Sequence, residues 1–562
     1  MGERRAARVR SVGIFTLACW STLAFSQTPP ADLIRQHERA VQDAQRRERP
    51  DVDIFIPDEA TPRRRAKANG DAPCHPIRQI RTAGHPDAMG EGPFDFLATF
   101  IGSCLSADDL NALLGDINRW YQQRGWTTTR VYATEQDISS GLLELRVVPG
   151  RIEGYRSPNS DREHRRRFAA AFPGQSGDYL NLRDLEQGLE NLNRLPSQQA
   201  RFKLYPGKEP GTSDVVIELL EKPAWRVSGM LDNSGTKAMG EWRSNTEFAL
   251  DNLLGRNDQL AIGYNRNLDG GMLDAKFEGV TFNYFIPQGK HLVGLSASTY
   301  ESVFTLPGIN QDYGMRTRST KAGLSYDYLF VRDQSSKTSL ISGIDFTHQT
   351  SHIGDIEIES QYRRLSVIYL GAKGKHYVGN QIYDWLFRFD QGTGLFDAMP
   401  SIPGGTDPRY TLAKAQFSGL VPLSLLPENW ANWRSTLQLQ AGNDKVPSLA
   451  QMYVGGRYNV RGFHDYNLYG ATGAWWRNDL ESKVLRWGDA SISGYGGLDA
   501  GWVKANDSQT VSQRHLAGYT LGVRGEIGAI KADLAYSRAI SRPDEFAGEA
   551  KGHWLAHLSI TL

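Results

Sequence analysis

Two glycine-rich motifs near the C-terminus carry opposite charges. Arg461 begins an Arg-Gly-Phe motif at the end of a loop, residues 454–463, that is rich in glycine and aromatic residues. Asp499 lies at the centre of a Gly-x-Asp-x-Gly motif at 497–501. Segments of alternating hydrophobicity surround both motifs. In the polar interior of a membrane barrel, a guanidinium and a carboxylate need each other as partners. The two motifs therefore predict a charge pair between Arg461 and Asp499 inside such a barrel.

The sequence offers no constellation for catalysis. It contains no Gly-x-Ser-x-Gly, no His-Glu-x-x-His and no nucleotide-binding fingerprint, and its 12 histidines show no metal-ligand spacing. We therefore expect a protein that is not an enzyme and that holds neither a metal nor a cofactor.

The first 26 residues predict export from the cytoplasm. Residues 1–26 combine four arginines, an apolar stretch at 12–20 and small residues at 24–26. This pattern is typical of a secretory signal peptide, and the apolar stretch is short for a membrane-spanning helix. A short N-terminal anchor helix is the alternative.

Two cysteines remain once the signal peptide, which contains Cys19, is removed. Cys74 and Cys104 allow a single internal pairing, and an oxidising periplasm would permit a disulfide. Two separate buried thiols are the alternative.

Composition restricts the class of protein. The chain has 562 residues, a net charge of +1, 40% hydrophobic residues and a mean hydropathy of −0.47. After the signal peptide no apolar run reaches the roughly 18 residues of a membrane-spanning helix, which excludes helical spans. A hydrophilic average is compatible with a membrane barrel, whose strands alternate lipid-facing and lumen-facing residues. The near-neutral charge gives no support to a nucleic-acid partner.

Residues 224–562 have the period-two pattern of β-strands. Alternating segments occur at 260–265, 322–330, 365–369, 437–441, 519–523, 532–536 and 554–562. In 365–369, for example, Leu365, Val367 and Tyr369 form the apolar face. Such alternation places one face against lipid and the other against a polar lumen. Some 340 residues then predict a transmembrane β-barrel of about 16 antiparallel strands. A large β-propeller or a tandem of sandwiches is the soluble alternative.

The segments directly after the signal peptide differ from the barrel. Residues 27–49 form a charged, helix-favouring segment with a thin apolar stripe through Leu33, Ile34, His37 and Val41. Such a helix would suit a wet lumen, and a solvated arm is an equal alternative. Residues 50–73 contain four prolines and a basic run, which indicates a linker.

Two small α/β units follow, at 74–150 and 151–223. In the first, Ser106 is the expected N-cap of a helix at 105–125, and strands are expected at 75–81, 128–134 and 142–148. In the second, Asn181 is a possible N-cap of a helix at 182–195, before strands at 200–205 and 214–220. The shared order of elements amounts to a weak internal repeat of about 75 residues.

Taken together, these segments resemble the TpsB transporters of two-partner secretion. The resemblance covers the whole mature chain, and the two α/β units resemble polypeptide-transport-associated (POTRA) domains. In that family the Arg-Gly-aromatic motif lies at the tip of an extracellular loop folded back into the barrel, and its arginine pairs with the aspartate on the inner wall. The resemblance implies that Arg461 and Asp499 form this pair, which we call the lock. The placement of Cys74 and Cys104 also matches many members of the family. It implies tight geometry at Gly462, Phe463, Gly497 and Gly501. The alternative is that Arg461 is only a charge of an extracellular loop.

The family's function follows as an expectation. An unfolded exoprotein (an adhesin, a haemolysin or a contact-dependent toxin) would dock on the POTRA domains by adding a strand to a sheet edge. The helix at 27–49, which plugs the pore in the family, and the loop at 454–463 would then move. The expected location is the outer membrane of a Gram-negative bacterium, with lipid and, during biogenesis, the barrel-assembly machinery as further partners. An outer-membrane assembly or insertion factor of the same superfamily is the alternative, and a plain porin would not need the α/β units.

Overall fold

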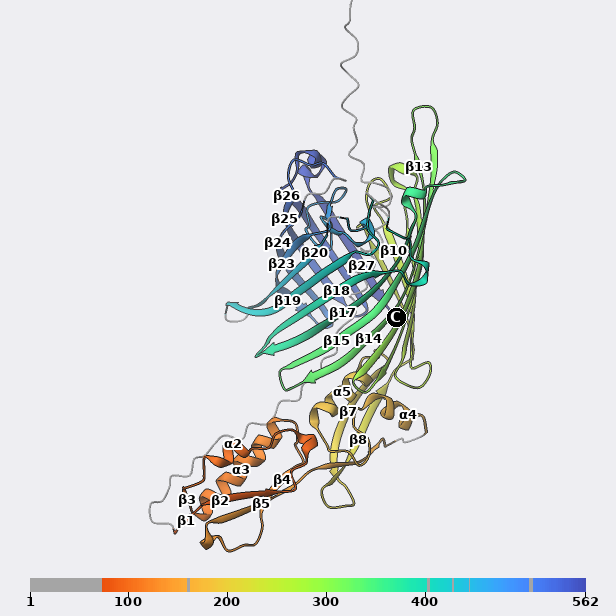
Figure 1. Cartoon of the computed structure of the whole chain (residues 1–562). Coiled ribbons are helices and arrows are strands. Elements are labelled where there is room, and N and C mark those ends of the chain that lie inside the picture. Colours follow the sequence, from red (N-terminus) through yellow and green to blue (C-terminus); the bar gives the residue numbers. More distant parts are fainter. Residues whose placement is uncertain (1–72, 159–161, 402–404, 427–428, 444, 505–508) are drawn as a thin grey trace, which may run out of the picture.

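The chain forms two small domains that lie below a large barrel (Figure 1). The computed structural model describes residues 73–562, apart from 159–161, 402–404, 427–428, 444 and 505–508. Residues 1–72 lie outside the described residues. They include the expected signal peptide (1–26), the expected plug helix (27–49) and all of the expected linker (50–73) except its last residue. None of the helices in the described part of the chain is long and apolar enough to cross a membrane.

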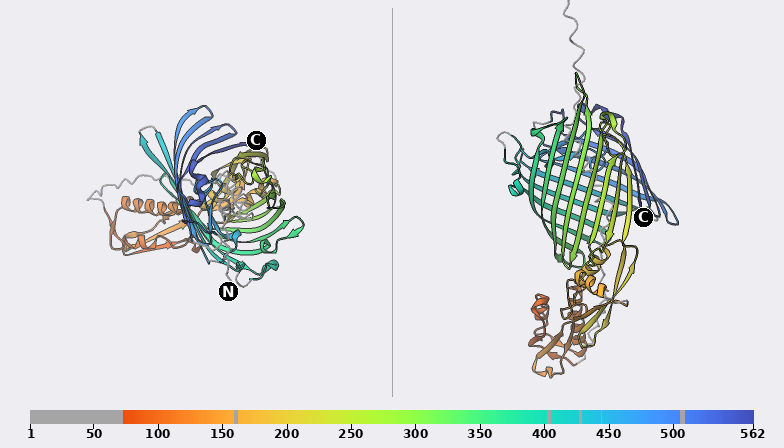
Figure 2. Two further views of the ribbon diagram at one scale, coloured as in Figure 1. Left: turned by 90° about the horizontal axis from the view of Figure 1, so that it is seen from above. Right: turned by 90° about the vertical axis from the view of Figure 1, so that its right-hand side faces the viewer.

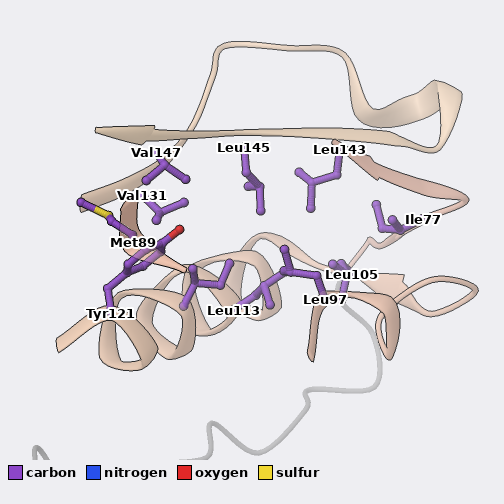
Figure 3. Packing of buried hydrophobic residues seen from close by; sticks show 11 residues of the cluster. Ile77, Met89, Leu97, Leu105, Leu113, Tyr121, Val131, Leu143, Leu145 and Val147 are labelled. Atoms are coloured by element: carbon purple, nitrogen blue, oxygen red, sulfur yellow. The ribbon is translucent and has the colours of Figure 1, made fainter. Parts of the chain in front are cut away.

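The first small domain is a three-stranded sheet covered by helix α3. Its elements are β1 (His75–Pro76), β2 (Gln79–Ala83), η1 (Asp87–Met89), α2 (Phe94–Ala98), β3 (Cys104–Leu105), α3 (Ala107–Gln123), β4 (Arg130–Ala133), η2 (Ile138–Ser140) and β5 (Leu142–Val148). The strand order is β2-β5-β4, with β2 and β5 parallel. Leu143, Leu145 and Val147 of β5 face Leu113 and Tyr121 of α3 in one buried core (Figure 3).

Helix α3 begins at the expected N-cap. The Ser106 hydroxyl accepts from the Asp109 backbone N–H, and the Asp109 carboxylate accepts from the Ser106 N–H, which satisfies two free donors of the first turn. In front of this cap, Cys74 and Cys104 form a disulfide, with their Cα atoms 5.4 Å apart. Cys74 directly precedes β1 and Cys104 lies on β3, so the bond links the two strands of this antiparallel pair.

The second domain repeats the order of strand, helix and two strands. It consists of β6 (Arg151–Arg156), α4 (Arg162–Ala171), α5 (Leu182–Asn193), β7 (Gln198–Pro206) and β8 (Thr212–Glu221), with strand order β6-β8-β7. The N-cap of α5 is Asn181, as expected. The sequence did not predict α4, because basic residues fill its middle and its apolar residues begin only at Phe168.

Sixteen long antiparallel strands close into the barrel, as the alternating pattern predicts. Their bounds are β9 (Trp225–Asp232), β10 (Arg243–Asp251), β11 (Gln259–Asn267), β12 (Lys276–Gln288), β13 (His291–Leu306), β14 (Tyr313–Arg332), β15 (Ser336–Ile353), β17 (Arg363–Val378), β18 (Gln381–Thr393), β19 (Thr411–Leu426), β20 (Asn429–Gly442), β23 (Gly473–Trp487), β24 (Ala490–Val503), β25 (His515–Ile527), β26 (Ile530–Ser541) and β27 (His553–Thr561). The last strand pairs with the first, with Leu558 opposite Leu231. Figure 2 shows the strands inclined to the barrel axis, as closure of a sheet requires.

Short elements occupy the connections between these strands. They are η3 (Gly271–Leu273), β16 (Ile356–Glu357), η4 (Glu359–Gln361), η5 (Leu395–Asp397), η6 (Ser448–Ala450), β21 (Met452–Val454), β22 (Leu468–Gly470) and η7 (Asp544–Lys551). Of these, β16 pairs only with the end of β15, whereas β21 and β22 form a separate two-stranded sheet.

The assignment of one apolar face to lipid is wrong for β17. Leu365, Val367 and Tyr369 are buried and face inward, whereas Ile368 and Leu370 are exposed on the outer face. Both faces of this strand are apolar, so alternation alone does not determine which face meets lipid. The inward choice is explained by packing, because Val367 belongs to a buried cluster with Leu412 of β19 and with residues of the connections: Tyr410, Val446, Ala450 and Ala471.

The second small domain is attached to the adjacent rim of the barrel by buried ion pairs. Arg332, at the end of β14, lies 2.6 Å from Glu190 and 3.4 Å from Glu186, both on α5. Lys337 lies 2.7 Å from the other oxygen of Glu190. The side chains of Arg332 and Glu186 are 3% and 0% exposed, so both buried charges need partners, and Glu186 has a second one in Arg183 at 2.7 Å.

Candidate functional site

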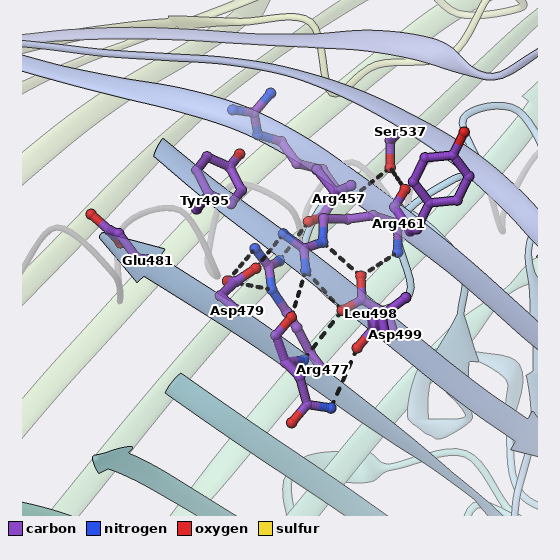
Figure 4. Close-up of polar contacts among 12 residues, drawn as sticks. Arg457, Arg461, Arg477, Asp479, Glu481, Tyr495, Leu498, Asp499 and Ser537 are labelled. Atoms are coloured by element: carbon purple, nitrogen blue, oxygen red, sulfur yellow. Dashed lines mark hydrogen bonds and ion pairs between the residues drawn. The ribbon is translucent and has the colours of Figure 1, made fainter. Parts of the chain in front are cut away.

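The loop between β21 and β22 brings Arg461 to the inner wall of the barrel (Figure 4). The loop turns tightly at Gly455 and Gly456, whose φ angles of 114° and 127° favour glycine. The Asn459 side chain fixes the turn, because its Oδ1 accepts from the N–H groups of Gly455 and Val460 at 2.8 and 2.6 Å. Arg461 follows directly and is 1% exposed.

Asp499 receives three hydrogen bonds from Arg461. Nε donates to Oδ2 at 2.6 Å, Nη2 donates to Oδ1 at 2.8 Å, and the backbone N–H donates to Oδ2 at 3.0 Å. Asp499 faces the lumen because its neighbour on β24, Leu498, is 63% exposed on the outer face. The two-pronged contact matches the planar geometry of both groups and fixes the orientation of the arginine as well as its position.

A second carboxylate, which the sequence interpretation missed, completes the site. Asp479 Oδ1 on β23 lies 2.6 Å from Arg461 Nη1, an ion pair that is short but does not have hydrogen-bond geometry. Its other oxygen lies 3.3 Å from Arg477 Nη2 and 3.9 Å from Arg524 Nη2. Arg461 therefore lies between two aspartates, one on each of two neighbouring strands. We call Arg461, Arg477, Asp479 and Asp499 the lumen cluster.

A signal for Asp479 was present in the sequence. Within β23 the polar Arg477, Asp479 and Glu481 alternate with Trp476 and Leu480, which are 49% and 43% exposed on the outer face. Because side chains alternate across a strand, this pattern places three charged groups on the lumen side. The strand register then sets Arg477 opposite Asp499 and Asp479 opposite Gly497.

The glycines around the lumen cluster leave room for the arginine and its loop. A Cβ at Gly497 would lie 2.1 Å from Arg461 Nη2, and one at Gly501 would lie 2.6 Å from a methyl group of Val454. Gly462 has a φ of 100°, and a Cβ there would approach the Arg538 backbone to 2.6 Å. A side chain at these positions would therefore displace the loop or the wall.

Phe463 has a packing role as well. Its side chain is 1% exposed and belongs to a buried apolar cluster formed by the loop, the wall and η7: Met452, Val454, Val460, Phe463, Leu468, Val503, Leu516 and Phe546. The loop is therefore held by apolar burial on one side and by ion pairs on the other.

Comparisons with known proteins place the chain in a family. Residues 211–525 match the model of the haemolysin secretion/activation proteins ShlB/FhaC/HecB. Residues 75–150 match the ShlB-type POTRA domain, and residues 151–206 match a POTRA domain. The chain belongs to the ShlB/FhaC/HecB family. It is thus an outer-membrane transporter of two-partner secretion, with its barrel in the membrane and its POTRA domains in the periplasm.

Relatives of this family extend over most of the chain. The outer membrane transporter CdiB-2 of Burkholderia pseudomallei is 30% identical over 80% of this chain and 78% of its own length. The transporter CdiB of Escherichia coli is 27% identical over 97% of this chain and 92% of its own length. The solved structure of CdiB from Escherichia coli has a TM-score of 0.85 at 23% identity, covering 96% of this chain and all of that one, which shows the shared fold.

Proposed function

We propose that this protein exports a large, unfolded exoprotein and that the loop at 455–467, between β21 and β22, is the gate of the pore. The lumen cluster is the observation that supports this proposal. A loop held inside the barrel by a buried arginine between two aspartates occupies space that a polypeptide in transit would need. The lock, Arg461 with Asp499, would have to open before the client passes.

A protein client is supported by the names of two relatives. HpmB of Proteus mirabilis and ShlB of Serratia marcescens, 27% and 25% identical to this chain, are named hemolysin transporters. We propose a client of the same general kind, whether adhesin, haemolysin or contact-dependent toxin. No catalytic step is needed for this function, and folding of the client outside the cell would supply the direction. Normal export of a client that cannot fold would contradict this source of direction.

We further propose that the client docks as an added strand on the POTRA sheets. Strands β4 and β7 each lie at the edge of their sheet, and an edge offers unpaired backbone groups to an extended peptide. The helix expected at 27–49, with Leu33, Ile34, His37 and Val41, would fill the remaining lumen until docking. Outer-membrane lipid and, during biogenesis, the barrel-assembly machinery are the further partners of this proposal.

Single-channel recording tests the proposed gate and plug. The mature protein and a variant without residues 27–49 are compared in a planar bilayer. A small, flickering pore that widens on deletion is the expected result. A wide pore that deletion leaves unchanged would overturn the plug and favour an assembly factor or a porin.

A further inference from the structure

The outer half of the gate loop ends in a contact that neither the lock nor the lumen cluster includes. The N–H groups of His464, Asp465 and Tyr466 all point to one atom, Oε1 of Glu549, at 2.8, 2.6 and 3.1 Å. Glu549 lies on η7, in the connection between β26 and β27. Three successive backbone N–H groups that converge in this way form a small anion-binding nest, and here the anion is a side chain of the same protein.

The surroundings make this contact selective for a carboxylate. Glu549 is 4% exposed, so its acceptor atom has little access to water. Burial raises the pKa of Glu549, whereas the backbone N–H groups of Asp465 and His464 lower it. Burial outweighs these donors, so the pKa of Glu549 stays above its ordinary value, but the donors offset part of the cost of the buried charge because hydrogen bonds to a charged group are stronger than those between neutral groups. Removing the charge leaves three donors around a weaker acceptor.

Neighbouring contacts bring the same loop segment to the same place. The rings of Tyr466 and Phe546 stack with centroids 5.1 Å apart. Asp465 accepts from the Lys237 backbone N–H at 2.8 Å and forms an ion pair with Lys237 Nζ at 3.1 Å. The segment that follows the Arg-Gly-Phe motif is thus attached to two connections of the barrel, the one that carries Lys237 and the one that contains η7.

We infer that Glu549 is a positioning residue for the gate. It forms an outer latch that holds residues 464–466, while Asp479 and Asp499 of the lumen cluster hold Arg461. The two holds are separate in space and chemistry, one on the wall strands β23 and β24 and one on η7. Opening of the gate therefore requires both to release, and loss of either raises the frequency of opening. This inference rests on the proposed role of the loop as a gate.

The test uses a reporter cysteine in the full mature chain. Val460 is fully buried in the loop, and a cysteine packs as a small apolar residue, so Val460→Cys becomes reactive only when the loop leaves its place. Cys74 and Cys104 are bonded to each other and do not react. The labelling rate with a membrane-impermeant maleimide is measured for Val460→Cys alone and combined with Glu549→Gln, Glu545→Gln or Arg461→Ala.

Glu545→Gln is the matched control. Glu545 also lies on η7 and its carboxylate also accepts a backbone N–H, but from Ser512 at 3.0 Å instead of from the gate loop. We expect Glu549→Gln to accelerate labelling by about tenfold or more, since several hydrogen bonds to a charged group are weakened at once. Glu545→Gln leaves the rate within about twofold of the reporter alone, as expected for an exposed surface change. Equal rates in the two variants would overturn the latch.

Two further measurements separate the possible failures. If Arg461→Ala accelerates labelling and Glu549→Gln does not, the latch is wrong and the gate stands. If neither does, the gate itself is wrong. Should Glu549→Gln fail to assemble, hydrogen exchange of the unsubstituted protein decides: the amides of 464–466 are expected to be protected, and rapid exchange at all three would overturn the latch.

Discussion

Gly518 on β25 lies directly beneath the main-chain carbonyl of Arg461. A Cβ at Gly518 would stand 1.9 Å from that carbonyl oxygen, far inside van der Waals contact. Gly518 is the partner of Asp499 in the register of β24 and β25, so this close approach lies beside the lock. The observed position of the loop therefore requires glycine at 518, which no sequence motif identifies.

We predict that Gly518→Ala displaces the gate loop without unfolding the barrel. The added methyl group cannot be accommodated against backbone atoms, so the loop must move and the pore should open more often in planar bilayers. Gly525→Ala is the matched control, because it lies on the same strand and its Cβ would meet no atom within 4 Å. Similar currents for the two variants would contradict the close approach.

Replacing Arg461 should strongly reduce export and leave the barrel folded. Arg461→Ala removes the shared partner of Asp499 and Asp479, and we expect a heat-modifiable, folded barrel with strongly reduced export of the client. Arg461→Lys keeps the charge but loses the two-pronged contact, so it should restore export only in part. Export by Arg461→Ala at the rate of the unsubstituted protein would rule out the lock.

Asp479 gives a sharper test of the lumen cluster. Asp479→Asn removes a carboxylate that faces Arg461, Arg477 and Arg524, and leaves three guanidinium groups near one another. Removing one partner of a buried ion pair typically costs about 3–5 kcal/mol. We expect a lower melting temperature and a more open pore. Glu526→Gln, whose exposed partner Lys531 lies 3.8 Å away on β26, should change neither.

The disulfide should stabilise the first POTRA domain alone. Replacing Cys74 and Cys104 by serine opens a loop with a sequence separation of 30. The chain-entropy model gives a loss of about 3–4 kcal/mol for a loop of this length. Hydrogen exchange should show faster exchange in β5 and α3 and no change in the second domain. Identical exchange in the first domain with and without the disulfide would contradict this prediction.

The second POTRA domain should loosen from the barrel when Arg332 is lost. Arg332→Ala removes the arginine that Glu186 and Glu190 share, so that Glu186 keeps Arg183 of its own helix and Glu190 keeps Lys337. We expect proteolysis near α5 to accelerate, because the buried charges of the two carboxylates lose part of their compensation and become more stable when exposed to water. Lys203→Ala is the control, since its pair with Glu218 is exposed and contributes little. Equal cleavage of the two variants would show that the domain is attached by other contacts.

Much of the architecture could be predicted because its signals are local. Ser106 and Asn181 cap helices as their side-chain chemistry indicates, and period-two alternation predicts the sixteen strands. Helix α4 was missed because a basic segment does not show which of its residues are buried. The apolar residues of β17 were assigned to the wrong side because both faces of that strand are apolar, and only packing within the barrel separates them.

By itself, the sequence determined an exported chain with two α/β units, a barrel, and an arginine and an aspartate that need each other. These conclusions depend on composition, hydrophobic periodicity and sequence motifs, which are local properties and do not require the contacts of the folded chain. Only the tertiary structure decided that Asp479 shares Arg461, that Gly518 lies beneath its carbonyl, and that Glu549 collects three N–H groups of the loop. Each of these contacts joins segments far apart in the chain, and it exists only where strand register and loop path bring two surfaces within hydrogen-bond distance.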